Sequence, residues 1–152
     1  MYRKILVPLD GSELAECVLR PVGDLVRGCE VENVVFLRVV EPLISMFYEN
    51  AALSPRELDS IETMRRDNAQ KYLNDVVSRV RYAVSTEVVF GGAAAEGIIE
   101  YARENSVDLI VIATHGRSGV RRWVWGSVAD RVLKAARVPV LMVRAPGCFP
   151  GI

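Results

Sequence analysis

The chain has 152 residues, 51% of them hydrophobic, and its 19 basic side chains balance its 19 acidic ones. This apolar composition excludes a disordered protein, and a net charge of zero provides no overall field to attract nucleic acid or an anionic membrane surface. The three cysteines lie far apart in sequence, and every apolar run is far shorter than the roughly 18 residues of a membrane span, so we expect a cytoplasmic protein with no nucleic-acid and no membrane partner.

Strand and helix patterns alternate from the N-terminus onward. The apolar run at 5–7 predicts a short buried strand that Pro8 closes. Ser12 predicts the N-cap of a first helix, with an acidic residue in its first turn, and Gly28 ends that helix. Because Pro21 falls inside this pattern, we expect it to remove one hydrogen bond and to kink the helix axis.

The second strand and the longest helix come next. Residues 34–40 are almost entirely apolar and predict a buried strand, after which an irregular segment extends to about Leu53. Ser54, Pro55 and Glu57 then form a strong helix start, because the serine can cap, proline fits the first helical position and the glutamate can complete a capping box. Apolar residues recur at helical spacing from there to Val80.

Four further elements continue the alternation up to the last predicted strand. They are a strand over 85–90, a helix over 95–102, a strand over 107–114 and a helix that Ser127 caps. Residues 138–143 form the last strand, and Pro139 places it at a sheet edge because proline cannot donate to the ladder.

Five strands that alternate with four helices predict an α/β fold. Because the strands are apolar on both faces, they predict an open parallel sheet covered by helices on both sides, Rossmann-like, with the strand order 3-2-1-4-5. We expect a single domain over residues 1–146, followed by a short C-terminal tail over 147–152.

Glycines and hydroxyl side chains fill the connection between the fourth strand and the last helix. Gly116 and Gly119 let the backbone approach a ligand closely, and Ser118 and the Arg117 amide add donors. Ser127 offers a hydroxyl at a helix N-terminus, where anions bind favourably. The pattern therefore predicts a phosphate-bearing ligand, although it contains neither a Walker A sequence nor G-x-G-x-x-G, and the glycines alone are also compatible with a simple tight turn.

The loop after the first strand should lie at the same place. In an open parallel sheet, ligands bind at the carboxyl ends of the strands where the strand order reverses, which is between strands one and four here. Asp10 follows the first strand, and its ionised carboxylate only accepts hydrogen bonds. It therefore suits ribose hydroxyls, an adenine amino group or a metal ion held by phosphates.

These residues together resemble the universal stress protein family. The family's nucleotide-binding members carry glycine, two residues, glycine, nine residues, then glycine and a hydroxyl residue, which corresponds here to Ala113, Gly116, Gly126 and Ser127. Residues 5–12, 36–41 and 136–143 are similar to the family's first, second and last strands. The resemblance implies a dimeric sensor or adaptor that binds ATP or AMP, with Mg²⁺ as a possible companion of the phosphates, and that signals to a protein partner of unknown identity.

The resemblance also implies the ligand contacts and the dimer interface. The adenosine would be lined by Pro8, Leu9, Asp10 and Val39, with the Val39 backbone against adenine. The ribose and phosphates would contact Ala113, Thr114, His115, Gly116, Arg117, Ser118, Gly119, Gly126, Ser127, Val128 and Ala129. The homodimer would form through the last strand, from Val138 to Val143.

Ala113 departs from the family pattern, which has glycine there. Its methyl group would crowd the ribose or the first phosphate if the backbone passed within contact distance, but alanine costs little if the residue has a negative φ. The only histidine, His115, has no evident nucleophile or acid partner, so we expect no catalytic residue. A slow metal-assisted ATP hydrolase and a dimeric interaction protein with an empty site remain the alternatives.

Overall fold

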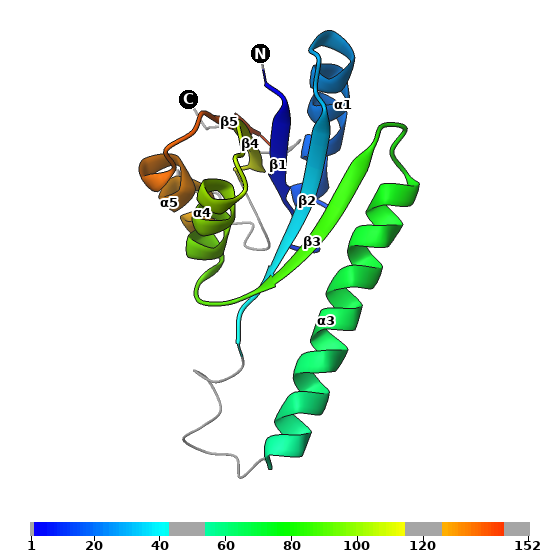
Figure 1. Cartoon of the computed structure of the whole chain (residues 1–152), viewed down its shortest axis with the longest axis vertical. Coiled ribbons are helices and arrows are strands. Elements are labelled where there is room, and N and C mark those ends of the chain that lie inside the picture. Colours follow the sequence, from blue (N-terminus) through cyan, green and yellow to red (C-terminus); the bar gives the residue numbers. More distant parts are fainter. Residues whose placement is uncertain (1, 43–53, 115–125, 145–152) are drawn as a thin grey trace, which may run out of the picture.

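The computed structural model describes residues 2–42, 54–114 and 126–144, which form one five-stranded parallel sheet with the order β3-β2-β1-β4-β5 (Figure 1). The strands are β1 (Lys4–Pro8), β2 (Asn33–Val40), β3 (Val84–Phe90), β4 (Leu109–Ala113) and β5 (Val140–Val143). The predicted fold class and strand order are confirmed, and β5 lies at the edge expected from Pro139.

Helices cover both faces of this sheet. One face carries the 3₁₀ helix η1 (Ala15–Val18), α1 (Leu19–Gly28) and α3 (Pro55–Ser78), and the other carries α4 (Ala94–Glu104) and α5 (Ser127–Ala135) (Figure 1). Because side chains alternate across a strand, Ile5 and Val7 pack on the first face and Leu6 on the second. All three are completely buried, so β1 is the centre of two hydrophobic clusters.

The start of the first helical segment differs from the prediction. Ser12 does not cap an α-helix: its hydroxyl accepts from the Ala15 amide at 3.2 Å in a turn, and η1 follows before α1 begins at Leu19. Pro21 is consequently the third residue of α1, within the first turn, where backbone N–H groups have no intrahelical partner. The expected interior position of Pro21 is therefore wrong, because the chain forms η1 first and α1 begins only two residues before the proline.

The predicted start of α3 is confirmed. The Ser54 amide donates to Glu57 Oε2 at 2.7 Å, and the Glu57 amide donates back to Ser54 Oγ at 3.4 Å, which completes the capping box. The Ser54 hydroxyl and amide hold the pKa of the Glu57 carboxyl below its usual range. The first turns of α3 are largely exposed and extend past the ends of the strands (Figure 1). None of the helices in the described ranges is both long and apolar enough to cross a membrane.

Asp108 joins the amino ends of β1 and β4. Its Oδ2 accepts from the Lys4 amide at 2.7 Å and from the Arg3 amide at 2.9 Å, and these two bonds lower the pKa of its carboxyl below the ordinary value of 3.8. Such a group stabilises the fold above its unfolded pKa, and the stabilisation is lost as the pH falls through the lower folded pKa.

Asp108→Asn is therefore expected to lower the midpoint of thermal unfolding at pH 7 and to weaken its decline below about pH 4. The midpoint measured from pH 7 down to pH 2 tests this. Asp67→Asn, an exposed change within α3, is the matched control and should reproduce the wild-type curve. An Asp108→Asn curve parallel to wild type throughout the acid range would contradict the assigned role.

Candidate functional site

β1 and β4 are the neighbouring strands between which the strand order of the sheet reverses. From this central pair, β2 and β3 lie on one side and β5 on the other. The Thr114 amide donates to the Val143 carbonyl at 2.9 Å, and the Gly126 amide donates to the Thr114 carbonyl at 2.8 Å. The start of α5 is thus fixed at the end of β4, on the same sheet edge as the loop after β1. Ligands bind at such edges in open parallel sheets.

Asp10 lies exposed in the loop after β1. Its Oδ1 accepts from the Ser12 amide at 2.9 Å and from the Ser12 hydroxyl at 2.5 Å. Gly11 between them has a φ of +82°, which favours glycine. Pro8 and Leu9 are buried beneath this loop, so among these residues it is Asp10 that presents a polar side chain at the sheet edge.

The backbone of Val39 faces the space beyond the end of β1, where β2 extends further than its neighbour. In the described part of the chain, the last backbone bond between β1 and β2 runs from the Leu9 amide to the Leu37 carbonyl at 2.9 Å. Alternate residues of a strand direct their backbone groups the same way, so the amide and carbonyl of Val39 also face the β1 side, beyond that last bond. They present one donor and one acceptor at the end of the sheet.

A cleft of about 580 Å³ opens between this edge and α3. Its volume is in the usual range for small-molecule sites. The cleft is lined by Asp10, Gly11, Arg38, Val39, Val40, Glu41, Arg65, Asn68, Ala69, Tyr72 and Ala94. Arg38 Nη1 donates to the Leu9 carbonyl at 3.2 Å, and Arg65 Nη1 donates to the Glu41 carbonyl at 2.7 Å. The Arg38 guanidinium therefore joins the end of β2 to the end of β1, and the Arg65 guanidinium joins α3 to the residue after β2.

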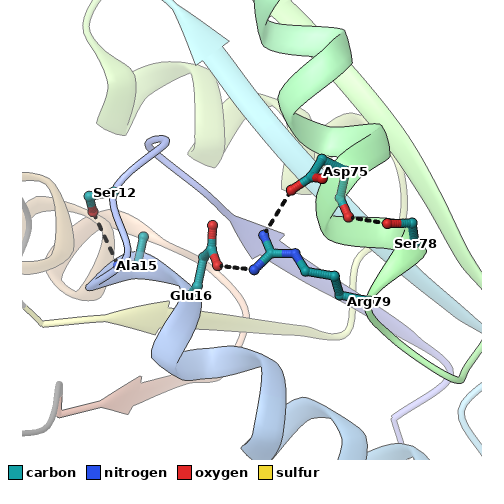
Figure 2. Close-up of polar contacts among 6 residues, drawn as sticks. All are labelled: Ser12, Ala15, Glu16, Asp75, Ser78 and Arg79. Carbon is teal, nitrogen blue, oxygen red and sulfur yellow. Dashed lines mark hydrogen bonds and ion pairs between the residues drawn. The ribbon is translucent and has the colours of Figure 1, made fainter.

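Ion pairs fix the helical segment after the acidic loop to the end of α3. Glu16 of η1 pairs with Arg79 at 2.8 Å, and Arg79 also reaches Asp75 at 3.3 Å, so the guanidinium lies between two carboxylates (Figure 2). The hydrogen bond to Glu16 raises the pKa of Arg79. Burial, followed by the charge of Glu16, raises the pKa of Tyr72 well above its ordinary value of 10. The loop from Asp10 to Ser12 is thus held between β1 and a well-anchored η1.

The first turn of α5 carries backbone donors that precede its helical hydrogen bonds. Asp130 makes the first intrahelical bond, from its amide to the Gly126 carbonyl at 2.9 Å, so the amides of Ser127, Val128 and Ala129 precede the helical ladder. Ser127 is exposed, whereas Val128 and Ala129 turn their side chains into the core. The predicted cap is wrong here: Gly126 is the N-cap and Ser127 the first helical residue, because the helical bonding begins one residue earlier.

Comparison with known proteins identifies the family. The model of the universal stress protein family matches residues 1–144. The chain belongs to the universal stress protein family. It is 28% identical over 161 residues to universal stress protein MJ0577 of Methanocaldococcus jannaschii, a match that covers 95% of this chain and 96% of the relative.

Solved structures of the family share this fold. The structure of MJ0577 superimposes with a TM-score of 0.79 at 27% identity, covering 97% of this chain and 99% of that one. A universal stress protein in complex with cAMP gives 0.64 at 17% identity, covering 94% and 97%. The Archaeoglobus fulgidus protein in complex with dAMP gives 0.56 at 22% identity, covering 93% and 97%.

In this universal stress protein, the alanine that replaces the family's first glycine fits its position. Ala113 is the last residue of β4 and pairs with Val143. Among the described non-glycine residues, Ser106 is the one with a positive φ, so the φ of Ala113 is negative. Its methyl group packs toward the cluster beneath α1 and α3. The condition under which alanine costs little is therefore met.

The described residues among the predicted site residues of this universal stress protein lie at strand ends and at one helix start. Asp10 and Val39 line the cleft, Ala113 ends β4 and Thr114 follows it, and residues 126–129 form the N-cap and first turn of α5. Residues His115, Gly116, Arg117, Ser118 and Gly119 lie outside the described ranges. Sequence reasoning missed the α3 wall with Arg65, Asn68 and Tyr72, because apolar periodicity marks the core face of a helix and not the polar positions at its border.

Proposed function

We propose that this universal stress protein binds an adenine nucleotide, ATP or AMP, between the ends of β1, β2 and β4, and acts as a dimeric sensor or adaptor in the cytoplasm. The observation that carries the proposal is the Val39 backbone, which offers a donor and an acceptor side by side toward the gap beyond β1. The Watson–Crick edge of adenine has the complementary pair, the N1 acceptor and the N6 amino donor. Guanine has the reverse order, an acceptor at O6 and a donor at N1, so it would pair with the same backbone groups only with its base turned over.

The remaining groups at this edge suit the ribose and the phosphates. Amides at the start of α5 are directed toward ligands at the helix N-terminus, where negative charge is favoured. Asp10 accepts hydrogen bonds from a ribose hydroxyl, or joins the phosphates in holding Mg²⁺, which prefers a few carboxylates together with phosphate oxygens. Family members in complex with cAMP and dAMP support an adenine nucleotide in this fold.

Mass spectrometry of small molecules released by denaturing the freshly purified protein tests the proposal. We expect near-stoichiometric ATP or AMP. ADP alone would lead to a turnover assay with Mg-ATP, because a slow hydrolase would leave that product. Absence of any nucleotide, together with absence of heat on titration with Mg-ATP and with AMP, would overturn the proposal.

The proposed homodimer pairs the β5 edges of two chains. β5 bonds to β4 on one side only, and the side chain of Leu141 at this edge is 39% exposed. An apolar edge strand of this kind is normally covered. A dimer through this strand would account for both features.

Leu141→Lys is accordingly expected to halve the molar mass in solution, because it replaces an exposed apolar side chain of the proposed interface with a charge in both chains. Light scattering coupled to size exclusion measures this. Leu133→Lys, on α5 and 42% exposed in the wild type, is the matched control and should retain the dimer. A Leu141→Lys protein that stays dimeric would remove β5 as the interface.

A further inference from the structure

Gly97 of α4 lies directly against Val39 of β2. A Cβ atom at position 97 would lie 2.9 Å from Val39 Cγ1 and 3.1 Å from Cγ2. Contacts between carbon atoms have their optimum near 3.5–4.0 Å. The absence of a side chain at Gly97 is therefore what allows α4 to pack this closely behind the residue whose backbone faces the proposed adenine position.

The Val39 side chain cannot avoid such a Cβ by rotation. Two of its three Cβ substituents, the methyl groups, both face Gly97, so every other staggered rotamer still places one methyl on that side. Its own Cβ would be only 3.6 Å away. Because valine is also stiff about this bond, the strain of an added methyl passes to the backbone of β2 or to α4.

α4 is held on its far side by α5, because Glu96 pairs with Arg131. At its start, the Ala94 amide donates at 3.0 Å to Oε1 of Glu41, the residue that follows β2. Ile98 is buried in the cluster beneath α4 and α5. At Val39, β2 retains β3 as a neighbour but has lost β1, so the Val39 peptide is the part that yields.

We infer that Gly97 is a positioning residue that sets the place of the Val39 peptide and thereby the affinity of the site for its base. The inference rests on the proposed adenine-nucleotide binding. The ligand is a purine nucleoside or nucleotide whose base meets that peptide. Gly97 itself does not contact it.

Gly97→Ala tests the inference, with ATP and adenosine titrated separately. We expect about a tenfold loss of affinity for both, the effect of one poorly aligned hydrogen-bond pair. The loss should be equal because the disturbance lies at the base and not at the α5 amides. Gly23→Ala is the matched control: this glycine is also buried in a helix, but a Cβ there would meet its nearest atom, on Tyr82, at 3.4 Å, and affinity should stay within twofold of wild type.

The double variant Val39→Ala/Gly97→Ala separates positioning from general damage to the fold. Removing both Val39 methyls frees the space that the new Cβ needs, so the double variant should bind as Val39→Ala alone does, without the tenfold loss. If Gly97→Ala fails to fold, Val39→Ile introduces the crowding from the strand side, and the same loss is expected.

Three outcomes would overturn the inference. Gly97→Ala binding within twofold of wild type, a loss confined to ATP with adenosine unchanged, or a double variant as weak as Gly97→Ala would each remove Gly97 as a positioning residue while leaving nucleotide binding in place. Wild-type protein that binds neither ATP nor adenosine would overturn the inference together with the proposed function.

Discussion

Gly126→Val is expected to lower the affinity for ATP at least about 100-fold while the protein remains folded. Gly126 has φ −47° and ψ 132°, a negative φ close to the extended region, so valine needs only a small change of the backbone there. Its carbonyl and amide keep their bonds to Asp130 and Thr114. A branched side chain at this N-cap would, however, occupy space beside the first amides of α5, which precede the helical ladder. Loss of two charge-assisted hydrogen bonds, about 1.5 kcal/mol each, corresponds to roughly 100-fold.

Calorimetric titration of Mg-ATP, together with thermal unfolding of the ligand-free protein, measures both parts of this prediction. Gly28→Val is the matched control, because Gly28 is also a glycine at a helix terminus, the last residue of α1, and a Cβ there would have open space around it. It lies at the other end of the sheet from the proposed site. If Gly126→Val bound ATP as tightly as wild type, the phosphates would not lie at the start of α5.

The order of the elements could be predicted from the sequence because local patterns determine it. Apolar runs and caps such as Ser54 to Glu57 depend on neighbouring residues, and the parallel order follows from strands that are apolar on both faces. The start of the first helix could not, because whether Ser12 caps an α-helix or begins a turn depends on how η1 is anchored. The Glu16–Arg79 contact that anchors it joins residues 63 positions apart.

The residues of the candidate site likewise fall into those that local patterns could predict and those that depend on contacts between distant segments. Asp10 lies in the loop after β1, and α5 is the next helix after β4, so topology alone places both at one edge. Two other features depend on how helices pack on the sheet, which the spacing of apolar residues does not reveal. They are the position of Arg38 opposite α3 and the close contact of Gly97 with Val39. Ala113 illustrates the difference. The sequence shows that alanine replaces a glycine there, but only the structure shows that the residue has a negative φ and pairs with Val143 at the end of β4.

Phe36→Ala is expected to lower the free energy of unfolding by about 3–5 kcal/mol, the usual cost of removing a buried aromatic side chain from a core. Phe36 is completely buried in β2, in the cluster with Leu73 and Val76 of α3. Denaturant unfolding monitored by circular dichroism measures the change. Phe90→Ala is the matched control: Phe90 is half-buried on β3 with the Arg66 guanidinium 4.5 Å from its ring, so its removal should cost clearly less.

The same variant tests whether the site depends on the core beneath it. A ligand that binds only the folded state adds about 2.7 kcal/mol at 100 times its Kd. Because Phe36 lies three residues before Val39 and its side chain is directed away from α4, its loss should weaken the fold without moving the Val39 peptide. Phe36→Ala should therefore regain about as much stability from saturating ATP as wild type does. A clearly smaller gain would mean that the cavity displaces the end of β2, and that the α3 face of the core also sets the position of the adenine contact.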